Sequence, residues 1–99
     1  MRWYDIDGVL IPGKVEPQHP YIVISGRMPH DWPRTMVELN SPVAVYLRSF
    51  GADGDHEAAG AWKAAIINLA GVTEFWEDVP KQAEIIHARC PACLVHLVT

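Results

Sequence analysis

Long apolar runs are missing from this sequence, and so are repeats and low-complexity tracts. No window approaches the roughly 18 consecutive apolar residues that a membrane-spanning helix needs. The start, MRWYDID, has neither the basic nor the apolar region of a secretory signal. We therefore expect a cytoplasmic protein with no membrane partner. A length of 99 residues, 49% of them hydrophobic, suits a single folded domain over residues 1–99.

Cysteine is scarce, which excludes a small scaffold held together by several disulfides. The two cysteines, Cys90 and Cys93, stand in the segment HARCPACLVH between His87 and His96. Zinc binding or redox chemistry is one interpretation of this segment, but a structural zinc site usually needs four ligands from two separated pairs. We favour two small buried thiols at the junction of a loop and a strand.

Positive charge is in the minority, with 8 Lys and Arg residues against 12 Asp and Glu residues, for a net charge of −4. This balance argues against broad, nonspecific attraction to nucleic acid or to an anionic membrane. It leaves room for a locally basic site.

Short apolar segments alternate with helical patterns along the chain. The strands are expected at residues 2–6, 21–25, 43–48, 73–77 and 93–98. The helices are expected at residues 31–40, 56–70 and 80–89, with Asp31 and Asp55 as N-caps of the first two and Pro80 opening the third. The strands show little polar alternation, as strands covered on both faces do. The pattern predicts an α/β fold: a three-layer, Rossmann-like, mainly parallel five-stranded sheet with helices on both faces.

Polar residues cluster where the expected strands end. They are Asp5, Asp7, Ser25, Gly26, Arg27, Arg48, Glu77 and Asp78. In parallel sheets, ligands bind at the carboxyl ends of the strands, so these groups are expected at one edge. Carboxylates this close repel one another unless a cation lies among them, and oxygen ligands favour Mg²⁺ over zinc.

The basic and hydroxyl groups expected near this edge suit a phosphate. Arg27, Arg48 and Lys63 supply positive charge, and the backbone N–H groups of residues 25–27 add donors. An aspartate can attack phosphorus and form an aspartyl-phosphate, which divides one displacement into two. Asp5 is the candidate nucleophile, and Asp7, two residues later, is the candidate general acid and base.

Four segments together resemble the haloacid dehalogenase (HAD) superfamily of phosphohydrolases. DIDGV at 5–9 is similar to its nucleophile motif, VISGR at 23–27 to its second motif, and FWEDVP at 75–80 to its acidic fourth motif. Lys63 matches the lone lysine of the third motif. The motifs occur in the family's order and span nearly the whole chain. An EF-hand interpretation of residues 5–16 fails, because the EF-hand glycine belongs at the sixth position and here is at the fourth.

The resemblance implies a role for each matching residue. Asp5 attacks the phosphate and binds Mg²⁺, while Asp7 transfers protons and ligates the metal through its backbone carbonyl. Ser25 bonds a phosphoryl oxygen, and Lys63 neutralises charge and restrains Asp5. Asp78 completes the metal site. Glu77 stands where many relatives have an aspartate, so it is either a direct ligand or a holder of metal-bound water, and we favour Asp78 as the direct ligand.

Inserted cap domains, which many relatives carry, have no room here, since only residues 9–20 separate the first motif from the second strand. An open site in this family goes with large substrates or with a second copy of the chain as a lid, so a homo-oligomer is one expectation. The segment LRSFGADGDHEAAGAWK is most similar to the 3′-phosphatase domain of polynucleotide kinase-phosphatases. This implies a nucleotide or a phosphorylated nucleic-acid end as substrate.

Plainer interpretations stay open at the level of sequence. Asp5 and Asp7 also suit a solvated turn, and Lys63 an ordinary surface lysine. Arg27 and Arg48 also suit plain surface charges. The whole chain is alternatively a non-catalytic phosphate-binding or interaction module on the same scaffold.

Overall fold

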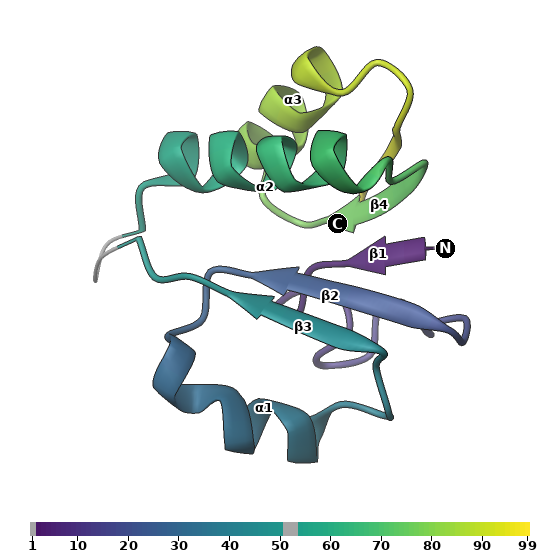
Figure 1. Cartoon of the computed structure of the whole chain (residues 1–99), viewed down its shortest axis with the longest axis vertical. Coiled ribbons are helices and arrows are strands. Elements are labelled where there is room, and N and C mark those ends of the chain that lie inside the picture. The colour runs from purple at the N-terminus through teal and green to yellow at the C-terminus, as the bar shows by residue number, and fades with distance from the viewer. Residues whose placement is uncertain (1, 51–53) are drawn as a thin grey trace.

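The structure is a computed structural model that describes residues 2–50 and 54–99. Its elements follow the order β1 (Arg2–Tyr4), β2 (Tyr21–Ser25), a 3₁₀ turn η1 (Pro29–Asp31), α1 (Trp32–Glu38), β3 (Ala44–Leu47), α2 (His56–Ala70), β4 (Glu74–Glu77), α3 (Pro80–Arg89) and β5 (Leu94–Leu97) (Figure 1). Each predicted strand and helix has a counterpart in this order.

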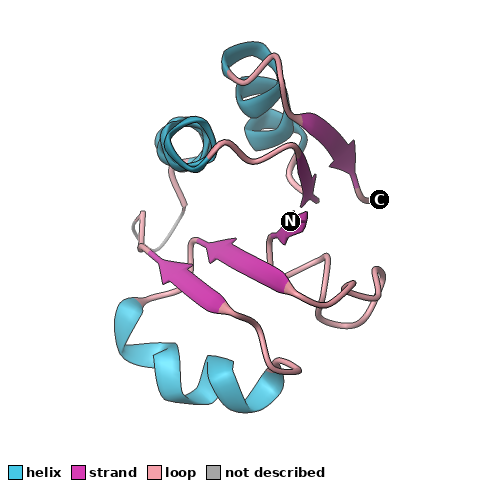
Figure 2. Cartoon of the chain, turned by 45° about the vertical axis from the view of Figure 1, so that its right-hand side comes forward, coloured by secondary structure: helices cyan, strands magenta, loops and turns pink. Residues whose placement is uncertain are grey.

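The five strands form one parallel sheet in the order β3-β2-β1-β4-β5. Central strand β1 pairs with both neighbours, so that Tyr4 lies opposite Val23 on one side and Trp76 on the other. Helix α1 lies on one face of the sheet, and α2 and α3 lie on the other (Figures 1 and 2). The predicted α/β class and parallel pairing are therefore confirmed, and the described sheet is parallel throughout.

Two of the predicted helix starts differ in how they are capped. Asp55 has an extended backbone, and its carboxylate accepts a hydrogen bond from the Ala58 N–H at 3.0 Å, as predicted. The predicted cap at Asp31 is wrong in its chemistry, because this side chain accepts no capping hydrogen bond. Asp31 lies in the preceding 3₁₀ turn with a near-helical backbone, so its carboxylate faces Arg34 at 3.6 Å instead.

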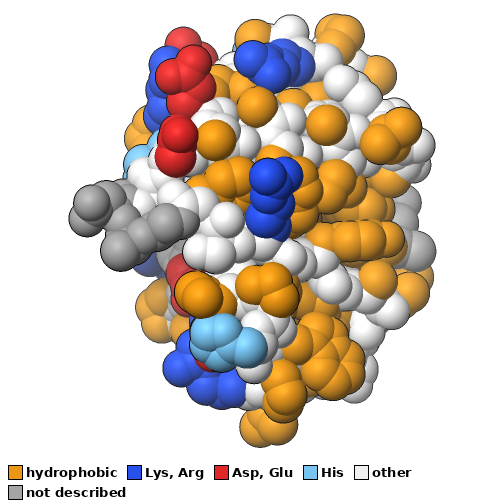
Figure 3. All heavy atoms as spheres, turned by 60° about the vertical axis from the view of Figure 1, so that its left-hand side comes forward, with side chains coloured by type: hydrophobic (Ala, Val, Ile, Leu, Met, Phe, Trp, Pro, Cys, Tyr) orange, Lys and Arg blue, Asp and Glu red, His pale blue; other side chains and the backbone are white. Residues whose placement is uncertain are grey.

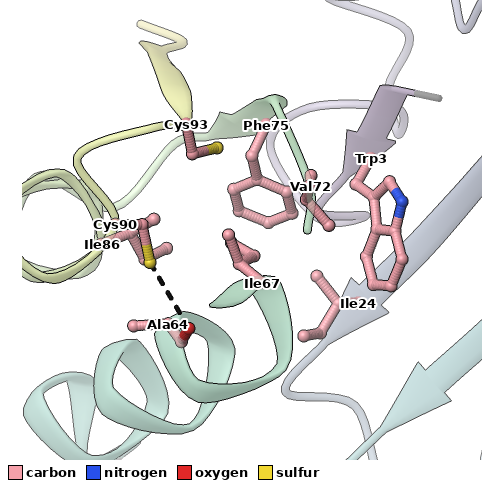
Figure 4. Close-up of a cluster of buried hydrophobic side chains, with 9 residues drawn as sticks. All are labelled: Trp3, Ile24, Ala64, Ile67, Val72, Phe75, Ile86, Cys90 and Cys93. Atoms are coloured by element: carbon pink, nitrogen blue, oxygen red, sulfur yellow. Dashed lines mark hydrogen bonds between the residues drawn. The ribbon is translucent and has the colours of Figure 1, made fainter. Parts of the chain in front are cut away.

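Two apolar clusters fill the two sides of the sheet. The cluster under α2 and α3 consists of Trp3, Ile24, Ala64, Ile67, Val72, Phe75, Ile86, Cys90 and Cys93 (Figure 4). The cluster on the α1 side consists of Tyr4, Ile6, Val9, Tyr21, Val23 and Leu39. Because β1 contributes to both clusters, the strand that leads to Asp5 is held from both faces.

The thiols of Cys90 and Cys93 belong to the first of these clusters. Cys90 donates a weak hydrogen bond to the Ala64 carbonyl at 3.4 Å (Figure 4). Burial raises the pKa of both thiols, that of Cys93 to about 11. Within the described residues, no group of three potential metal ligands includes either cysteine. The interpretation as buried, apolar-like thiols fits this placement.

Acidic side chains gather toward one side of the face shown in Figure 3. Most of the acidic side chains visible there lie along its left margin, and hydrophobic side chains cover much of the rest. Large apolar residues that remain exposed on the molecule include Val37, Val43, Tyr46 and Leu69. No helix among the described residues is long and apolar enough to cross a membrane.

Candidate phosphate and metal site

A shallow pocket of about 240 Å³ lies at the carboxyl edge of the sheet. Its walls are Asp5, Asp7, Ser25, Gly26, Arg27, Lys63, Asp78, Val79 and Gln82. Seven of the nine candidate site residues therefore meet in one pocket, although they come from four separate segments of the chain. Glu77 is fully buried and does not line the pocket, and Arg48 does not line it either.

Lys63 is buried between two carboxylates, so its interpretation as a surface lysine is wrong. It is 1% exposed, and its Nζ lies 2.6 Å from Glu77 Oε1 and 3.4 Å from Asp5 Oδ1. The other oxygen of Glu77 accepts hydrogen bonds from the N–H groups of Asp78 and Val79. Glu77 is thus fully occupied in holding Lys63 and the turn after β4.

Burial is the largest single influence on the pKa values of the ionisable groups in this cluster. Removal from water raises the pKa of Asp5 to about 7; Lys63 opposes this shift, and Glu77 adds to it. Burial also disfavours the charged form of Lys63, but Asp5 and Glu77 outweigh it, so its pKa is raised. The pKa of Asp78 is raised by burial and by neighbouring Asp5. Asp5 and Asp78 therefore hold a proton more readily than ordinary aspartates do, and a cation in the pocket would oppose this.

The side chain of Asp78, which lines the pocket, lies directly against Gly8. Gly8 has φ +81, and a Cβ built on it would lie 2.0 Å from Asp78 Oδ2. Only glycine leaves room for the carboxylate here and tolerates this backbone conformation. The glycine of the DIDGV segment therefore makes room for the acid that follows β4, seventy residues later in the chain.

Three carboxyl groups are close enough to share one cation. Asp5, Glu77 and Asp78 each offer an oxygen, and these oxygens lie within 4.8 Å of one another. An all-oxygen set fits a hard cation such as Mg²⁺, which usually takes only one or two carboxylates from the protein. Asp5 and Asp78 line the pocket, whereas Glu77 already bonds Lys63 and the backbone. The geometry thus favours Asp5 and Asp78 as the direct ligands.

Asp7 points away from this cluster and pairs with Arg27. The guanidinium contacts both carboxylate oxygens, with Nε 2.9 Å from Oδ2 and Nη2 2.8 Å from Oδ1. Its remaining Nη1 donates to Thr35 and Glu38 of α1. The hydrogen bonds from Arg27 lower the pKa of Asp7. Arg27 is therefore no plain surface charge: it ties α1 to the loop after β1.

Ser25 and Arg48 follow neighbouring strands but have different surroundings. Ser25 is 2% exposed, and its hydroxyl accepts a hydrogen bond from the Arg27 N–H at 3.2 Å. This bond tightens the turn at residues 25–27 on the pocket wall. Arg48 is exposed, and its guanidinium lies over the Phe50 ring, 5.1 Å from the centroid. Of the predicted phosphate contacts, Arg48 is the one that does not line the pocket.

Sequence reasoning missed Gln82 on the pocket wall and the two α1 residues that hold Arg27. Gln82 lies in the first turn of α3, one helical turn beyond Asp78. Its place in the first turn of the helix that follows β4 was the available signal. The sequence around Thr35 and Glu38 gave no such signal, because only the tertiary packing of α1 brings these residues to Arg27.

Comparisons with protein-family models, curated proteins and solved structures found no match for this chain. The function is therefore argued from the chemistry of the pocket.

Proposed function

We propose that this protein is a Mg²⁺-dependent phosphomonoester hydrolase of the HAD type that works through an aspartyl-phosphate. The observation that carries the proposal is the buried Asp5 carboxyl, with Lys63 at 3.4 Å and Asp78 beside it, on the wall of an open pocket. A buried acid paired with a buried lysine at the carboxyl edge of a parallel sheet is costly for folding and useful for chemistry.

The first step is attack by an Asp5 oxygen on phosphorus, with cleavage of the bond from phosphorus to the ester oxygen. The departing alkoxide takes a proton from Asp7 and leaves as an alcohol. Water then gives a proton to Asp7 and attacks the same phosphorus, the bond to Asp5 breaks, and phosphate leaves with the Asp5 carboxylate restored. Asp5 and Asp78 would hold a Mg²⁺, which would supply positive charge to offset the charge that collects on the phosphoryl oxygens.

The remaining pocket residues divide the supporting roles. Lys63, held by Glu77, favours the ionised form of Asp5 and so opposes the effect of burial. Ser25 and the turn after it offer donors to a phosphoryl oxygen. Asp7 is the proton-transfer residue, and this role requires its carboxylate to leave Arg27, because a guanidinium-bound carboxylate stays ionised.

The Asp7–Arg27 pair also favours a second candidate function. If this pair persists in the presence of ligand, no free acid stands ready for the leaving oxygen. The chain would then bind a phosphorylated ligand without turning it over. This is the non-catalytic module on the same scaffold.

The test is phosphate release from sugar phosphates, nucleotides and 3′-phosphorylated oligonucleotides by the wild type and Asp5→Asn, with Mg²⁺ and with chelator. Asp31→Asn is the matched control, because Asp31 lies outside the pocket. We expect release by the wild type and the control, and a loss of at least about a thousandfold in Asp5→Asn. Calorimetric binding of phosphate esters without release would favour the second function, and neither binding nor release would reject both.

A further inference from the structure

Trp32 begins the stripe of α1 that faces the sheet. Thr35, Met36 and Leu39 continue this stripe at helical spacing, and the fold buries Thr35 and Leu39. Trp32, by contrast, is 51% exposed. Residues on one helix face would be covered alike if the sheet extended under all of them. The stripe is therefore covered at Thr35 and Leu39 but open to solvent at Trp32.

The open end of this stripe lies at the carboxyl edge of the sheet, beside the pocket. Helix α1 starts on the side of the molecule toward which β2 and β3 point (Figure 1). Thr35, one turn after Trp32, accepts a hydrogen bond at 3.2 Å from Nη1 of Arg27, which lines the pocket. Side chains three residues apart on a helix are neighbours, about 5–6 Å apart at their Cβ atoms, and they lean toward the helix start. The indole therefore lies close to Arg27, at the margin of the pocket.

Trp32 differs from the other tryptophans in its ring contacts. Each of the others packs against at least one aromatic ring, in the pairs Trp3–Tyr46, Trp62–Phe50, Trp76–Tyr4 and Trp76–His96. No ring among residues 2–50 and 54–99 packs in this way against the indole of Trp32. This indole is thus available to a ring from outside the protein.

The segment around Trp32 restrains the backbone and adds apolar surface. Pro29 and Pro33 each fix a backbone φ angle, one on either side of Trp32. Met28, which follows Arg27 directly, is 45% exposed. Two large apolar side chains therefore stand exposed next to a pocket whose walls carry mostly charged and polar groups. Apolar surface beside such a pocket suits the organic part of an ester.

The place of the indole limits which organic groups can reach it. The phosphoryl group belongs among the charged and hydroxyl groups of the pocket, so the alcohol part of the ester projects past the margin. A ring bonded directly to the ester oxygen stays beside the phosphorus, inside the pocket. A planar ring several bonds further out reaches the indole, where stacking between the two rings is favourable.

We propose that Trp32 is a specificity-determining residue that stacks on a planar aromatic ring in the alcohol part of the substrate. The substrate class is then a phosphate monoester whose ring is separated from the ester oxygen by a spacer of several bonds. Nucleoside monophosphates and arylalkyl phosphates share this chemistry. The proposal rests on the proposed function of the adjoining pocket.

The experiment measures kcat/KM on two matched pairs of esters. Adenosine 5′-monophosphate and ribose 5-phosphate share the sugar phosphate, and 3-phenylpropyl phosphate and propyl phosphate share the alkyl phosphate. We expect the wild type to favour the ring-bearing ester by about tenfold, the range of one stacked ring. A preference in both pairs assigns ring stacking in general, and a preference in one pair alone identifies the kind of ring that Trp32 takes.

Variants of Trp32 separate stacking from simple apolar contact. Trp32→Ala and Trp32→Leu should both lose the preference, because leucine keeps apolar volume without a ring, and Trp32→Phe should keep most of it. Val37→Ala is the matched control, an apolar truncation at a residue of α1 that is 86% exposed, and it should keep the preference. A preference that survives in Trp32→Leu would overturn the proposal. So would an equal loss on all four esters together with a lower unfolding temperature, which would indicate a structural role.

Failure of the hydrolase proposal would be visible separately. If none of the esters is hydrolysed, calorimetry with Mg²⁺ measures the binding of each pair to the wild type and to Trp32→Leu. Tighter binding of a ring-bearing ester by the wild type alone supports the role of Trp32 even in a non-catalytic protein. Equal binding within both pairs overturns it.

Discussion

Asp5 is a carboxyl group that the fold withdraws from water and surrounds with three charged groups. The nearest are Lys63 and Glu77 on the inner side, with Asp78 toward the pocket. Such an arrangement makes the cluster responsive to any cation that enters, because ionising Asp5 without one is unfavourable. Residues of this kind reduce the stability of the free protein in exchange for reactivity.

The raised pKa of Asp5 predicts how stability depends on pH. Its folded-state pKa is about 7 and its ordinary value is 3.8, so the folded protein binds this proton more tightly, and this group's contribution to stability falls as pH rises from about 4 to about 7. Asp5→Asn stays neutral and avoids this loss, while Lys63 keeps Glu77. We expect Asp5→Asn to unfold roughly 4–8 °C above the wild type at pH 8, about 1 kcal/mol in a domain of this size.

Thermal unfolding without metal at pH 5 and pH 8 checks this expectation. The gap between the two proteins should be smaller at pH 5, where Asp5 is largely protonated in the wild type. An equal gap at both pH values would contradict the assigned protonation.

Gly8→Ala should damage the proposed cation site more than the fold. Its Cβ would collide with Asp78 Oδ2, whereas a Cβ on Gly13, which also has positive φ, meets only a carbonyl oxygen at 3.9 Å. Both variants carry backbone strain of roughly 1–2 kcal/mol. We expect Mg²⁺ affinity, measured by calorimetry, to fall at least about tenfold in Gly8→Ala, the cost of one displaced carboxylate, and to change little in Gly13→Ala. Equal affinities in the two variants would remove Asp78 from the site.

At the scale of elements, the helices packed on the sheet decide how the pocket is framed. Helix α2 carries Lys63 into the cluster, and α3 begins at the turn that Glu77 holds. Helix α1 anchors Arg27 through Thr35 and Glu38. Each wall of the pocket thus comes from the first residues after a strand or from a helix packed against them.

The N-caps of α2 and α1 offer a matched comparison. Asp55→Ala removes a capping hydrogen bond and should lower the free energy of unfolding by about 1 kcal/mol. Asp31→Ala, at the corresponding position of α1, removes no such bond and should cost less than about 0.5 kcal/mol. Urea unfolding of both variants measures the difference. Equal costs would mean that the cap bond at Asp55 contributes nothing to stability.

At the scale of the whole molecule, the parallel sheet gathers residues that are far apart in sequence. Each strand delivers its last residues to the same edge, while two apolar clusters hold the sheet from both faces. The cysteines belong to this packing, since the thiols of Cys90 and Cys93 lie under α2 and α3 (Figure 4).

Both thiols should resist alkylation in the native protein. With a pKa of about 11, only about one Cys93 thiol in a thousand is ionised at pH 8, and burial blocks access as well. Mass spectrometry after treatment with iodoacetamide should find almost no adduct in the native state and two adducts in urea. Rapid modification of the native protein would contradict the placement of this pair in the core.

The order of strands and helices, the capping of α2 and the candidate residues could all be predicted from the sequence by itself. Apolar runs, turn residues and motif spacing are local properties, so they are readable without coordinates. Pairing and contacts are not local. Only the tertiary structure decided that Lys63 is buried against Glu77, that Asp7 faces Arg27, and that Arg48 lies outside the pocket.

The same distinction applies to the loop that begins at Asp5. The sequence by itself determined that two acids and a glycine stand at the end of a strand, because the apolar run before them and the turn residues show it. The tertiary structure decided that one acid is withdrawn from water, that the other binds a guanidinium, and that Gly8 makes room for Asp78. Burial and charge pairing depend on which distant segments pack together, and that packing assigns different chemistry to two identical side chains two residues apart.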